Sequence, residues 1–147
     1  MKTSMKVKTL IGIALLLWIL PVGNVCAENT VYLGGIYPMS GGAAFMGISW
    51  DRGLQLACEE INRRGGITVA GKKYQVKGVS YDDEMNPAKS VAGLRKLKLK
   101  HNIPVYSMAV SSCSLATLKV NQDLGGLWLG LAIDPRITAS GNKLVLR

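Results

Sequence analysis

Short apolar runs alternate along this chain with segments of helical periodicity, and this alternation restricts the fold more than any other feature. Strands and helices that alternate across short turns are typical of a parallel sheet covered by helices, with right-handed crossovers. The sequence therefore predicts an α/β fold. The runs of strand character are residues 31–37, 74–81, 103–110 and 127–132, with a fifth beginning at 144–146. The helical segments between them are residues 47–64, 87–100 and 115–123.

Glycine, asparagine and proline mark the limits of these segments. Gly65 and Gly66 follow the first helical segment, and glycine adopts the left-handed conformation of a helix C-terminus at low cost. Asn86 and Pro87 suit the N-cap and the first position of the second helix. Residues 67–71 suit a small hairpin arm before the second strand. The turns therefore agree with the strand and helix pattern.

A hydroxyl-rich segment, Ser111-Ser112-Cys113-Ser114, lies between the third strand and the third helix. A helix N-terminus presents unpaired backbone N–H groups and partial positive charge, so it can hold an anion such as a carboxylate. The same serines could instead only cap the helix. In parallel sheets, however, ligands bind beyond the carboxyl ends of the strands, where this segment lies. Its place in the pattern therefore favours a binding site.

The pair Asp82 and Asp83 follows the second strand, and paired carboxylates suggest acid–base chemistry. Neighbouring residues on an extended chain point to opposite sides, however. We therefore expect these two carboxylates not to share a site.

The chain has a formal net charge of +9, three units of which come from Lys2, Lys6 and Lys8 near the N-terminus. A basic balance can indicate nucleic-acid binding. Few aromatic residues lie among the other basic residues. The basic residues at 95–100 fit the solvated side of a helix. We therefore expect no nucleic-acid partner.

Residues 1–27 have the features of a secretory signal peptide. The three lysines precede an apolar stretch, residues 10–20, and Val25-Cys26-Ala27 places small residues at a cleavage position. Cleavage after Ala27 would deliver the rest of the chain to the periplasm. An uncleaved membrane anchor is the alternative, but the apolar stretch is short for a span. Lipid attachment through Cys26 is a second alternative.

Two cysteines, Cys58 and Cys113, remain after such a cleavage. Export favours oxidation, so they could pair. Cys58 lies on the apolar side of a predicted helix, and buried free thiols are common, so we expect two free thiols. His101 is the only histidine, and no Cys-x-x-Cys pair exists, so we expect neither a metal nor a cofactor.

Several short motifs follow one another along the chain. They are G-I-Y-P-M-S-G at 35–41, R-G at 52–53, E-E-I-N at 59–62, Y-D-D at 81–83, N-P at 86–87 and D-P-R-I-T at 134–138. Together they resemble the periplasmic leucine/isoleucine/valine-binding proteins of ABC transporters, and the resemblance covers nearly all of the chain after residue 27. It implies two Rossmann-like lobes that close by a hinge around a small ligand. Residues 28–147 would then be the N-terminal lobe of a type I periplasmic binding protein, with the second lobe absent.

The resemblance also implies ligand residues in the serine-rich segment. Ser114 matches the ligand hydroxyl of the family, and Ser112 precedes it in the same segment. One type of family member bridges this segment to the turn after the second strand by a disulfide. Here Cys113 would face Met85, so that bridge is absent.

Two further turns are implied to contact the ligand. Ala132 matches a position whose backbone carbonyl serves the ligand, and Ile133 stands where a threonine or serine is usual. The aromatic residue of the family's cleft falls near Met46, beside Phe45. The implied ligand is a branched-chain or other amino acid, or a small carboxylate, and the implied partner is an ABC permease.

Four alternatives stand beside this function. A ligand-sensing receptor domain would share the fold, and a truncated chain could be a non-functional remnant of a binding protein. An enzyme with Ser114 as nucleophile needs a base, but His101 precedes the third strand, at the opposite edge of the sheet, and no Gly-x-Ser-x-Gly motif surrounds the serine. Residues 34–42 do not spell the Gly-x-Gly-x-x-Gly motif of dinucleotide binding. We therefore expect a binding protein without catalytic activity.

Overall fold

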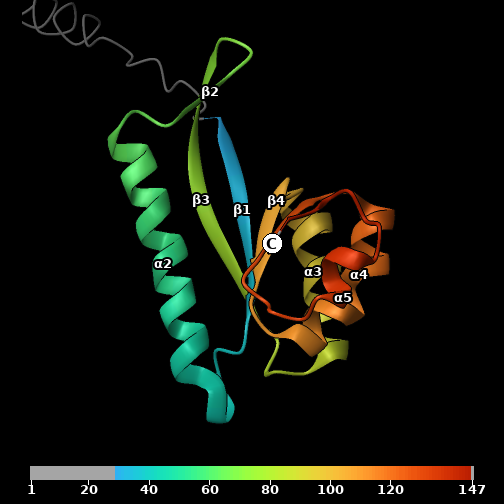
Figure 1. Cartoon of the computed structure of the whole chain (residues 1–147). Helices are drawn as coiled ribbons and strands as arrows, with labels where there is room; N and C mark the ends of the chain where they lie inside the picture. Colours follow the sequence, from blue (N-terminus) through green and yellow to red (C-terminus); the bar gives the residue numbers. More distant parts are fainter. Residues whose placement is uncertain (1–28, 147) are drawn as a thin grey trace, which may run out of the picture.

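The computed structural model describes residues 29–146 and shows helices packed against a twisted sheet (Figure 1). Its strands are β1 (Thr30–Tyr37), β2 (Ile67–Val69), β3 (Lys72–Asp82), β4 (Val105–Met108), β5 (Leu127–Gly130) and β6 (Val145–Leu146). They form one sheet in the order β2-β3-β1-β4-β5-β6. Strand β2 pairs antiparallel with β3, and the other pairings are parallel. The predicted parallel sheet is therefore confirmed.

The helices of the described residues cover both faces of this sheet. Helix α2 (Ala44–Arg63), preceded by the 3-10 turn η2 (Gly41–Ala43), lies over β1 and β3 on one face (Figure 1). Helices α3 (Pro87–His101), α4 (Ser111–Leu124) and α5 (Arg136–Ala139) lie on the other face. None of the helices in residues 29–146 is long and apolar enough to cross a membrane.

Several predicted boundaries are wrong. Helix α4 begins at Ser111 and not at residue 115, so the serine-rich segment is the first turn of the helix and not a loop before it. Helix α2 begins at Ala44 and not at residue 47, because Phe45 and Met46 already have helical geometry. Strands β4 and β5 end two residues earlier than predicted, and α5 was not predicted. The signal peptide and Cys26 lie outside the described residues.

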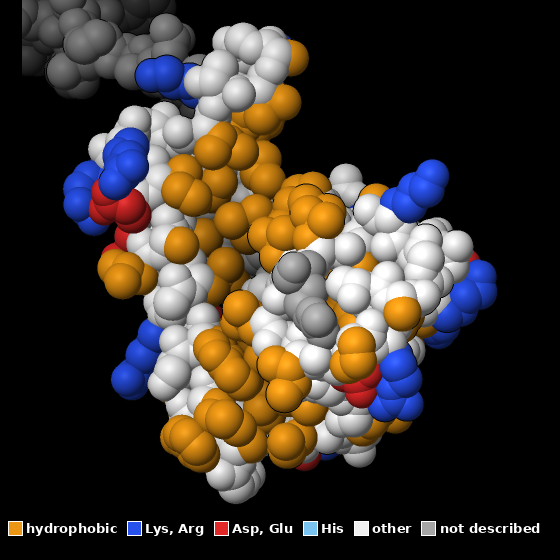
Figure 2. Space-filling view, viewed as in Figure 1, with side chains coloured by type: hydrophobic (Ala, Val, Ile, Leu, Met, Phe, Trp, Pro, Cys, Tyr) orange, Lys and Arg blue, Asp and Glu red, His pale blue; other side chains and the backbone are white. Residues whose placement is uncertain are grey.

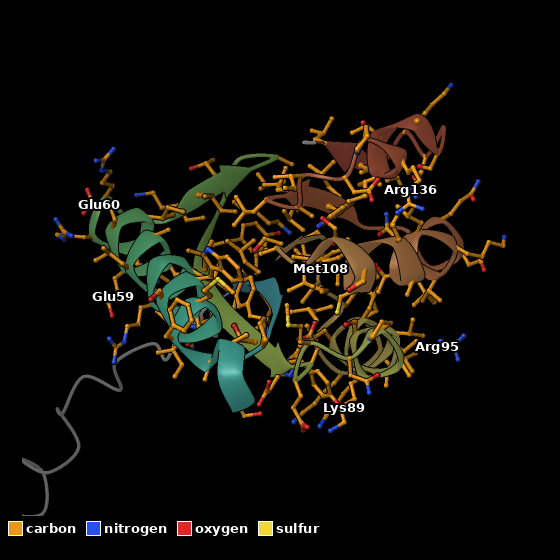
Figure 3. The ribbon with its side chains drawn as sticks, turned by 60° about the horizontal axis from the view of Figure 1, so that its bottom comes forward. Glu59, Glu60, Lys89, Arg95, Met108 and Arg136 are labelled. Atoms are coloured by element: carbon orange, nitrogen blue, oxygen red, sulfur yellow. The ribbon has the colours of Figure 1, made fainter. Side chains whose placement is uncertain are left out.

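The core lies between the sheet and helices α3, α4 and α5. Along the strands, side chains alternate between the two faces of the sheet, and those facing α3 and α4 are the most deeply buried. Met108 is fully buried and points into the interior, whereas Glu59 and Arg95 point outward (Figure 3). The cluster comprises Ile36, Leu94, Leu97, Ile103, Tyr106, Met108, Cys113, Trp128, Ala132, Ile137 and Val145.

Hydrogen bonds from side chains fix the start of α3, as the sequence predicted, and the end of α2. Asn86 caps α3, because its Oδ1 accepts hydrogen bonds from the backbone N–H groups of Ala88 at 2.9 Å and Lys89 at 3.3 Å. At the end of α2, the amide of Asn62 both donates to the carbonyl of Val76 and accepts from its N–H group, each at 2.8 Å. This paired contact holds α2 against β3.

The hairpin arm formed by β2 and β3 is confirmed, and it turns through Ala70 and Gly71, both with positive φ. Near the start of α2, Gly47 allows the helix to approach the turn after β1 closely. A Cβ atom on Gly47 would lie 2.0 Å from the carbonyl oxygen of Pro38. The absence of a side chain there lets the first turn of α2 lie against the turn after β1.

Candidate functional site

The turns after β1, β3, β4 and β5 meet at one edge of the sheet, because these strands are parallel and hydrogen-bonded side by side. Asp82 joins the first two turns. Its Oδ1 accepts hydrogen bonds from the N–H groups of Met39 at 2.8 Å and of Glu84 at 2.9 Å. The edge of the sheet is therefore an ordered platform.

Hydrogen bonds favour the charged form of Asp82. Burial acts to raise the pKa of this carboxyl, but the hydroxyl of Ser40 and the backbone N–H groups around it outweigh burial. The pKa of Asp82 consequently lies below its usual value. This carboxylate organises the turns, since it accepts hydrogen bonds from backbone N–H groups and from the Ser40 hydroxyl of the protein itself.

Asp83 points away from Asp82 and is fully buried. Its Oδ2 accepts a hydrogen bond from the hydroxyl of Ser90 at 2.8 Å, and its Oδ1 accepts one from the N–H group of Met85 at 3.0 Å. The two neighbouring carboxylates thus accept hydrogen bonds from different donors. The prediction that they do not share a site is confirmed.

The N-terminus of α4 lies at the same edge and lacks a side-chain cap. Its N-cap residue is Val110, which has no capping side chain, and no acidic residue lies in the first turn. The interpretation of the serines as helix caps is therefore wrong, because these residues form the first turn itself. Helix α3 differs, since Asn86 occupies its first donors. The first N–H groups of α4 therefore have no capping side chain, in an arrangement that favours an anion.

The two predicted serines of this turn have different surroundings. Ser112 is exposed, whereas Ser114 is fully buried. The Oγ atom of Ser114 has no hydrogen-bond partner among the described residues. Tyr106, Asn121 and Trp128 each have such an atom as well, but none of them belongs to the first turn of α4. Ser114 is therefore a buried polar residue in the first turn of α4, and its hydroxyl makes no hydrogen bond within residues 29–146.

Cys113 and Cys58 are both buried and free, which confirms the prediction of two free thiols. Burial raises the pKa of the Cys113 thiol, and the side chains of Ser90 and Asp83 lie within its electrostatic reach. The raised pKa keeps this thiol protonated and unreactive at neutral pH.

The remaining predicted ligand residues form a rim around this edge. Ala132 is buried in the turn after β5, and Met46 is half-buried in α2. Ile133 is 85% exposed and Phe45 is 71% exposed. The structure thus brings these residues to the edge of the sheet, with two large apolar side chains facing outward.

His101 lies far from this edge. It ends α3, and its ring contacts the ring of Tyr32 in the first half of β1, with 4.9 Å between the ring centroids. Within the described residues, no side chain is hydrogen-bonded to the Oγ atom of Ser114. Within the described residues, no group of three or more His, Cys, Asp or Glu side chains is placed to hold a metal ion.

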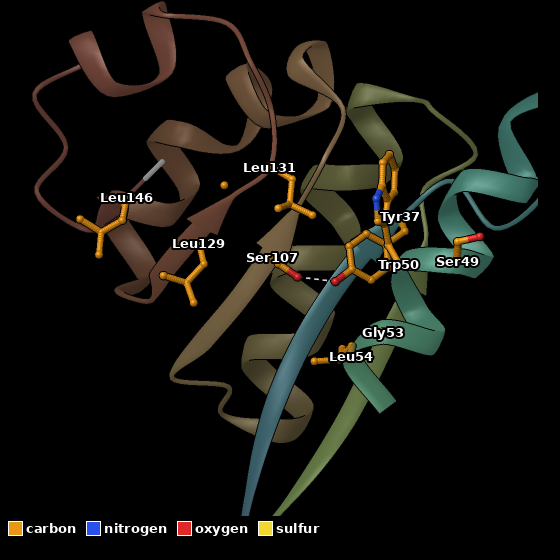
Figure 4. A pocket seen from close by; sticks show the side chains of 10 residues that line it. Tyr37, Ser49, Trp50, Gly53, Leu54, Ser107, Leu129, Leu131 and Leu146 are labelled. Carbon is orange, nitrogen blue, oxygen red and sulfur yellow. Dashed lines mark hydrogen bonds between the residues drawn. The ribbon is translucent and has the colours of Figure 1, made fainter. Parts of the chain in front are cut away.

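A further hollow of the described surface lies between α2 and strands β4 to β6, and we call it the α2-side groove (Figure 4). Its volume is about 490 Å³. On its floor, the hydroxyl groups of Tyr37 and Ser107 are hydrogen-bonded to each other. None of the predicted ligand residues lines it. Its walls include Trp50, Leu54, Leu129, Leu131 and Leu146.

The spacing of two leucines is the sequence feature that belongs to this groove, but the predicted strand pattern did not identify it as a groove. Leu129 and Leu131 are two residues apart, so they share one face of an extended chain. In an apolar run that reads as buried on both faces, such leucines look like core residues. Only the structure shows that this face of β5 is open.

Comparisons with known proteins agree with this fold. The sequence profile of a family described as periplasmic binding protein matches residues 30–143. The chain belongs to the periplasmic binding protein family. A leucine-, isoleucine-, valine-, threonine- and alanine-binding protein from Pseudomonas aeruginosa is 31% identical over 122 residues, which are 82% of this chain and 32% of that protein.

Solved structures of binding proteins share the arrangement of strands and helices. The branched-chain amino acid transporter substrate-binding protein of Streptococcus pneumoniae, in complex with isoleucine, matches with a TM-score of 0.70 and 23% identity, over 80% of this chain and 33% of that one. A fatty acid ABC transporter substrate-binding protein from Thermomonospora curvata matches with a TM-score of 0.66 and 26% identity, over 81% and 29% of the two chains. This chain therefore spans about a third of the length of these relatives.

Proposed function

We propose that this chain is a solute-binding lobe of an ABC transporter system, exported to the periplasm, which holds an amino acid or another small carboxylate at the N-terminus of α4. The observation that carries this proposal is the uncapped start of α4 at the carboxyl edge of the sheet. Backbone N–H groups and the helix dipole both favour a carboxylate there.

The residues around the helix start support a ligand with a carboxylate and an apolar body. Ser112 is exposed beside the free N–H groups, and the buried Oγ of Ser114 has a hydrogen bond still to make. The exposed side chains of Phe45 and Ile133 provide apolar contacts at the rim. Amino acids and fatty acids, which the named relatives bind or transport, share this chemistry.

Ser114 then acts as a hydrogen-bond donor to the ligand, and the lobe performs no covalent chemistry. The partner in transport is an ABC permease, which receives the ligand from the exported binding protein. Signal-peptide cleavage after Ala27 belongs to the same proposal.

The test uses the full chain, produced with its own leader and recovered from the periplasm of a host cell. Thermal unfolding is measured with leucine, with 4-methylpentanoate, which lacks the ammonium group, and with leucinamide, which lacks the carboxylate. A ligand that binds only the folded state raises the midpoint. We expect leucine and 4-methylpentanoate to raise it and leucinamide to leave it unchanged. A shift by leucinamide alone, or by none of the three, contradicts the proposal.

A pair of variants then locates the site. Ser114→Ala removes a hydrogen bond to a charged group, which contributes roughly 1.5–3 kcal/mol, so affinity for leucine should fall at least about tenfold. Thr68→Ala removes an exposed hydroxyl from β2, in the hairpin arm, and should leave the affinity unchanged. Equal affinities of the two variants would exclude Ser114 from the site.

A further inference from the structure

Helix α3 carries five lysine or arginine side chains and no acidic one. Lys89 is paired with Glu84, and the amine of Lys98 donates a hydrogen bond to the carbonyl of Ile103 at 2.9 Å. The other three basic side chains make no ion pair within residues 29–146. They are Arg95, Lys96 and Lys100. Most of the charge of this helix is therefore not neutralised by carboxylates of the described residues.

Other helices pair cations with carboxylates of their own. On α2, Arg63 and Arg64 both pair with Glu60, and on α4 Lys119 pairs with Asp123. Figure 2 shows such neighbouring red and blue side chains at the margins of the face that carries α2. Helix α3 has no carboxylate that could play this part.

The helix dipole explains only part of the charge of α3. A helix C-terminus favours cations, but this effect falls off within the last turn. Arg95 and Lys96 precede the basic residues of the last turn. Arg95 points outward from the helix (Figure 3), and the ammonium group of Lys96 lies 5.5 Å from the centroid of the Tyr81 ring. These two cations are therefore free to attract an anionic partner.

A leucine lies among these cations. Leu99 is 83% exposed. Arg95 and Lys96 precede it by four and three residues, so the three side chains share one side of the helix. Lys100 follows it and is also exposed. We call these four residues the outer face of α3, and this face combines an exposed apolar side chain with cations around it.

An anionic lipid surface matches both features of this face. Lipid phosphates attract lysine and arginine, and an exposed leucine gains free energy when it enters the boundary between headgroups and acyl chains. The phosphate backbone of a nucleic acid would attract the same cations but would offer Leu99 no apolar contact. We propose that the outer face of α3 binds an anionic lipid surface, with Leu99 in this boundary and the cations on the lipid phosphates.

This inference goes beyond the proposed function. It shares with it only the proposed export, because an exported chain meets the membrane that holds an ABC permease. Ligand binding at the start of α4 does not require the outer face of α3. A failure of the vesicle test below would therefore leave the ligand test unaffected, and the reverse also holds.

The test is binding to lipid vesicles. The full chain, recovered from the periplasm as for the ligand test, is sedimented with vesicles that contain phosphatidylglycerol and with vesicles of phosphatidylcholine alone. We expect binding to the anionic vesicles only, and we expect about 0.5 M sodium chloride to weaken it, because salt screens exposed charges. Each cation near an anionic surface contributes about fivefold to binding. The triple variant Arg95→Gln, Lys96→Gln, Lys100→Gln should therefore bind about a hundredfold more weakly.

A second triple variant controls for net charge. Arg63→Gln, Arg64→Gln, Lys119→Gln removes the same number of cations, but these are exposed side chains that already pair with carboxylates. It should weaken vesicle binding less than tenfold. All variants keep the same N-terminus, so residues 1–27 affect them alike. Thermal unfolding midpoints equal to that of the parent chain verify that both variants fold.

A pair of leucine variants tests the apolar contact. Leu99→Gln should weaken vesicle binding at least threefold, whereas Leu56→Gln, on α2 with a side chain 63% exposed, should leave it unchanged. Equal effects of the two substitutions would contradict the placement of Leu99 in the lipid.

Three other results overturn the proposal. The first is equal binding to the two kinds of vesicle, or an equal loss in the two triple variants. The second is tighter binding of the outer face of α3 to double-stranded DNA than to vesicles, because the partner is then a nucleic acid. The third is release from the vesicles by inorganic phosphate but not by sodium chloride of the same ionic strength, because the face then holds a free anion.

Discussion

The approach of α2 to the turn after β1 depends on Gly47, and Gly47→Ala tests it. The added Cβ atom would lie 2.0 Å from the carbonyl oxygen of Pro38 and 2.4 Å from its carbonyl carbon. An ordinary carbon–oxygen contact is about 3.3 Å, so the helix and the turn must separate by about 1.3 Å. Both sides of this contact are backbone, so no flexible side chain can relieve it.

Two opposing effects set the size of the change. Alanine stabilises a helix by about 1 kcal/mol relative to glycine. Overpacking costs typically 1–3 kcal/mol, and a backbone clash lies at the upper end of that range. We therefore expect Gly47→Ala to destabilise the protein by about 2 kcal/mol, which lowers the midpoint of thermal unfolding by about 8 °C in a domain of this size.

Gly53 in the same helix is the matched control, because a Cβ atom there meets nothing within 4 Å. Gly53→Ala gains the higher helix propensity of alanine without a steric clash. It should therefore raise the midpoint of thermal unfolding by about 4 °C. Both midpoints are read from circular dichroism at 222 nm. If Gly47→Ala were as stable as Gly53→Ala, α2 would not lie against Pro38, and the placement of Phe45 and Met46 at the site would fail with it.

Two further predictions concern polar contacts of the lobe. The pKa of Asp82 is lower in the folded state, so its stabilisation is fully present above the unfolded pKa of about 3.9 and is lost as the pH falls through the folded value. Asp82→Asn should therefore lower stability at pH 7 and weaken the loss of stability as the pH falls below about 5, as measured by urea unfolding; an unchanged acid dependence would contradict this role. Asn62→Ala leaves two backbone groups of Val76 without their partner and should cost about 1–3 kcal/mol. A urea midpoint equal to that of the parent chain would show that water replaces the amide.

The strands and the capped helix were predictable because each depends on local sequence. An apolar run such as residues 31–37 has few alternatives to a buried strand, and β1 occupies it. Asn86 and Pro87 specify the start of α3 through their own side chains, and the structure has the helix begin there. In both cases the residues that determine the structure are those that adopt it.

The start of α4 was not predictable in this way. Serine has only moderate helix propensity and favours caps and turns, so the run from Ser111 to Ser114 indicated a loop. Packing of Cys113 and Ser114 into the interior brings this turn into the helix. The apolar character of Leu129 likewise indicated burial on both faces, but burial depends on a covering element that the described residues do not include. Tertiary contacts decide both positions.

The site and the groove are connected by what each leaves uncovered. Binding sites normally enclose most of a small ligand's surface. At the start of α4, however, Phe45 and Ile133 are 71% and 85% exposed, so a ligand held there by this lobe would be covered from one side. On the open face of the sheet, Leu129 and Leu146 are also 45% and 53% exposed. A ligand held at the start of α4 therefore keeps part of its surface in solvent, so we expect its binding by this chain to be weak.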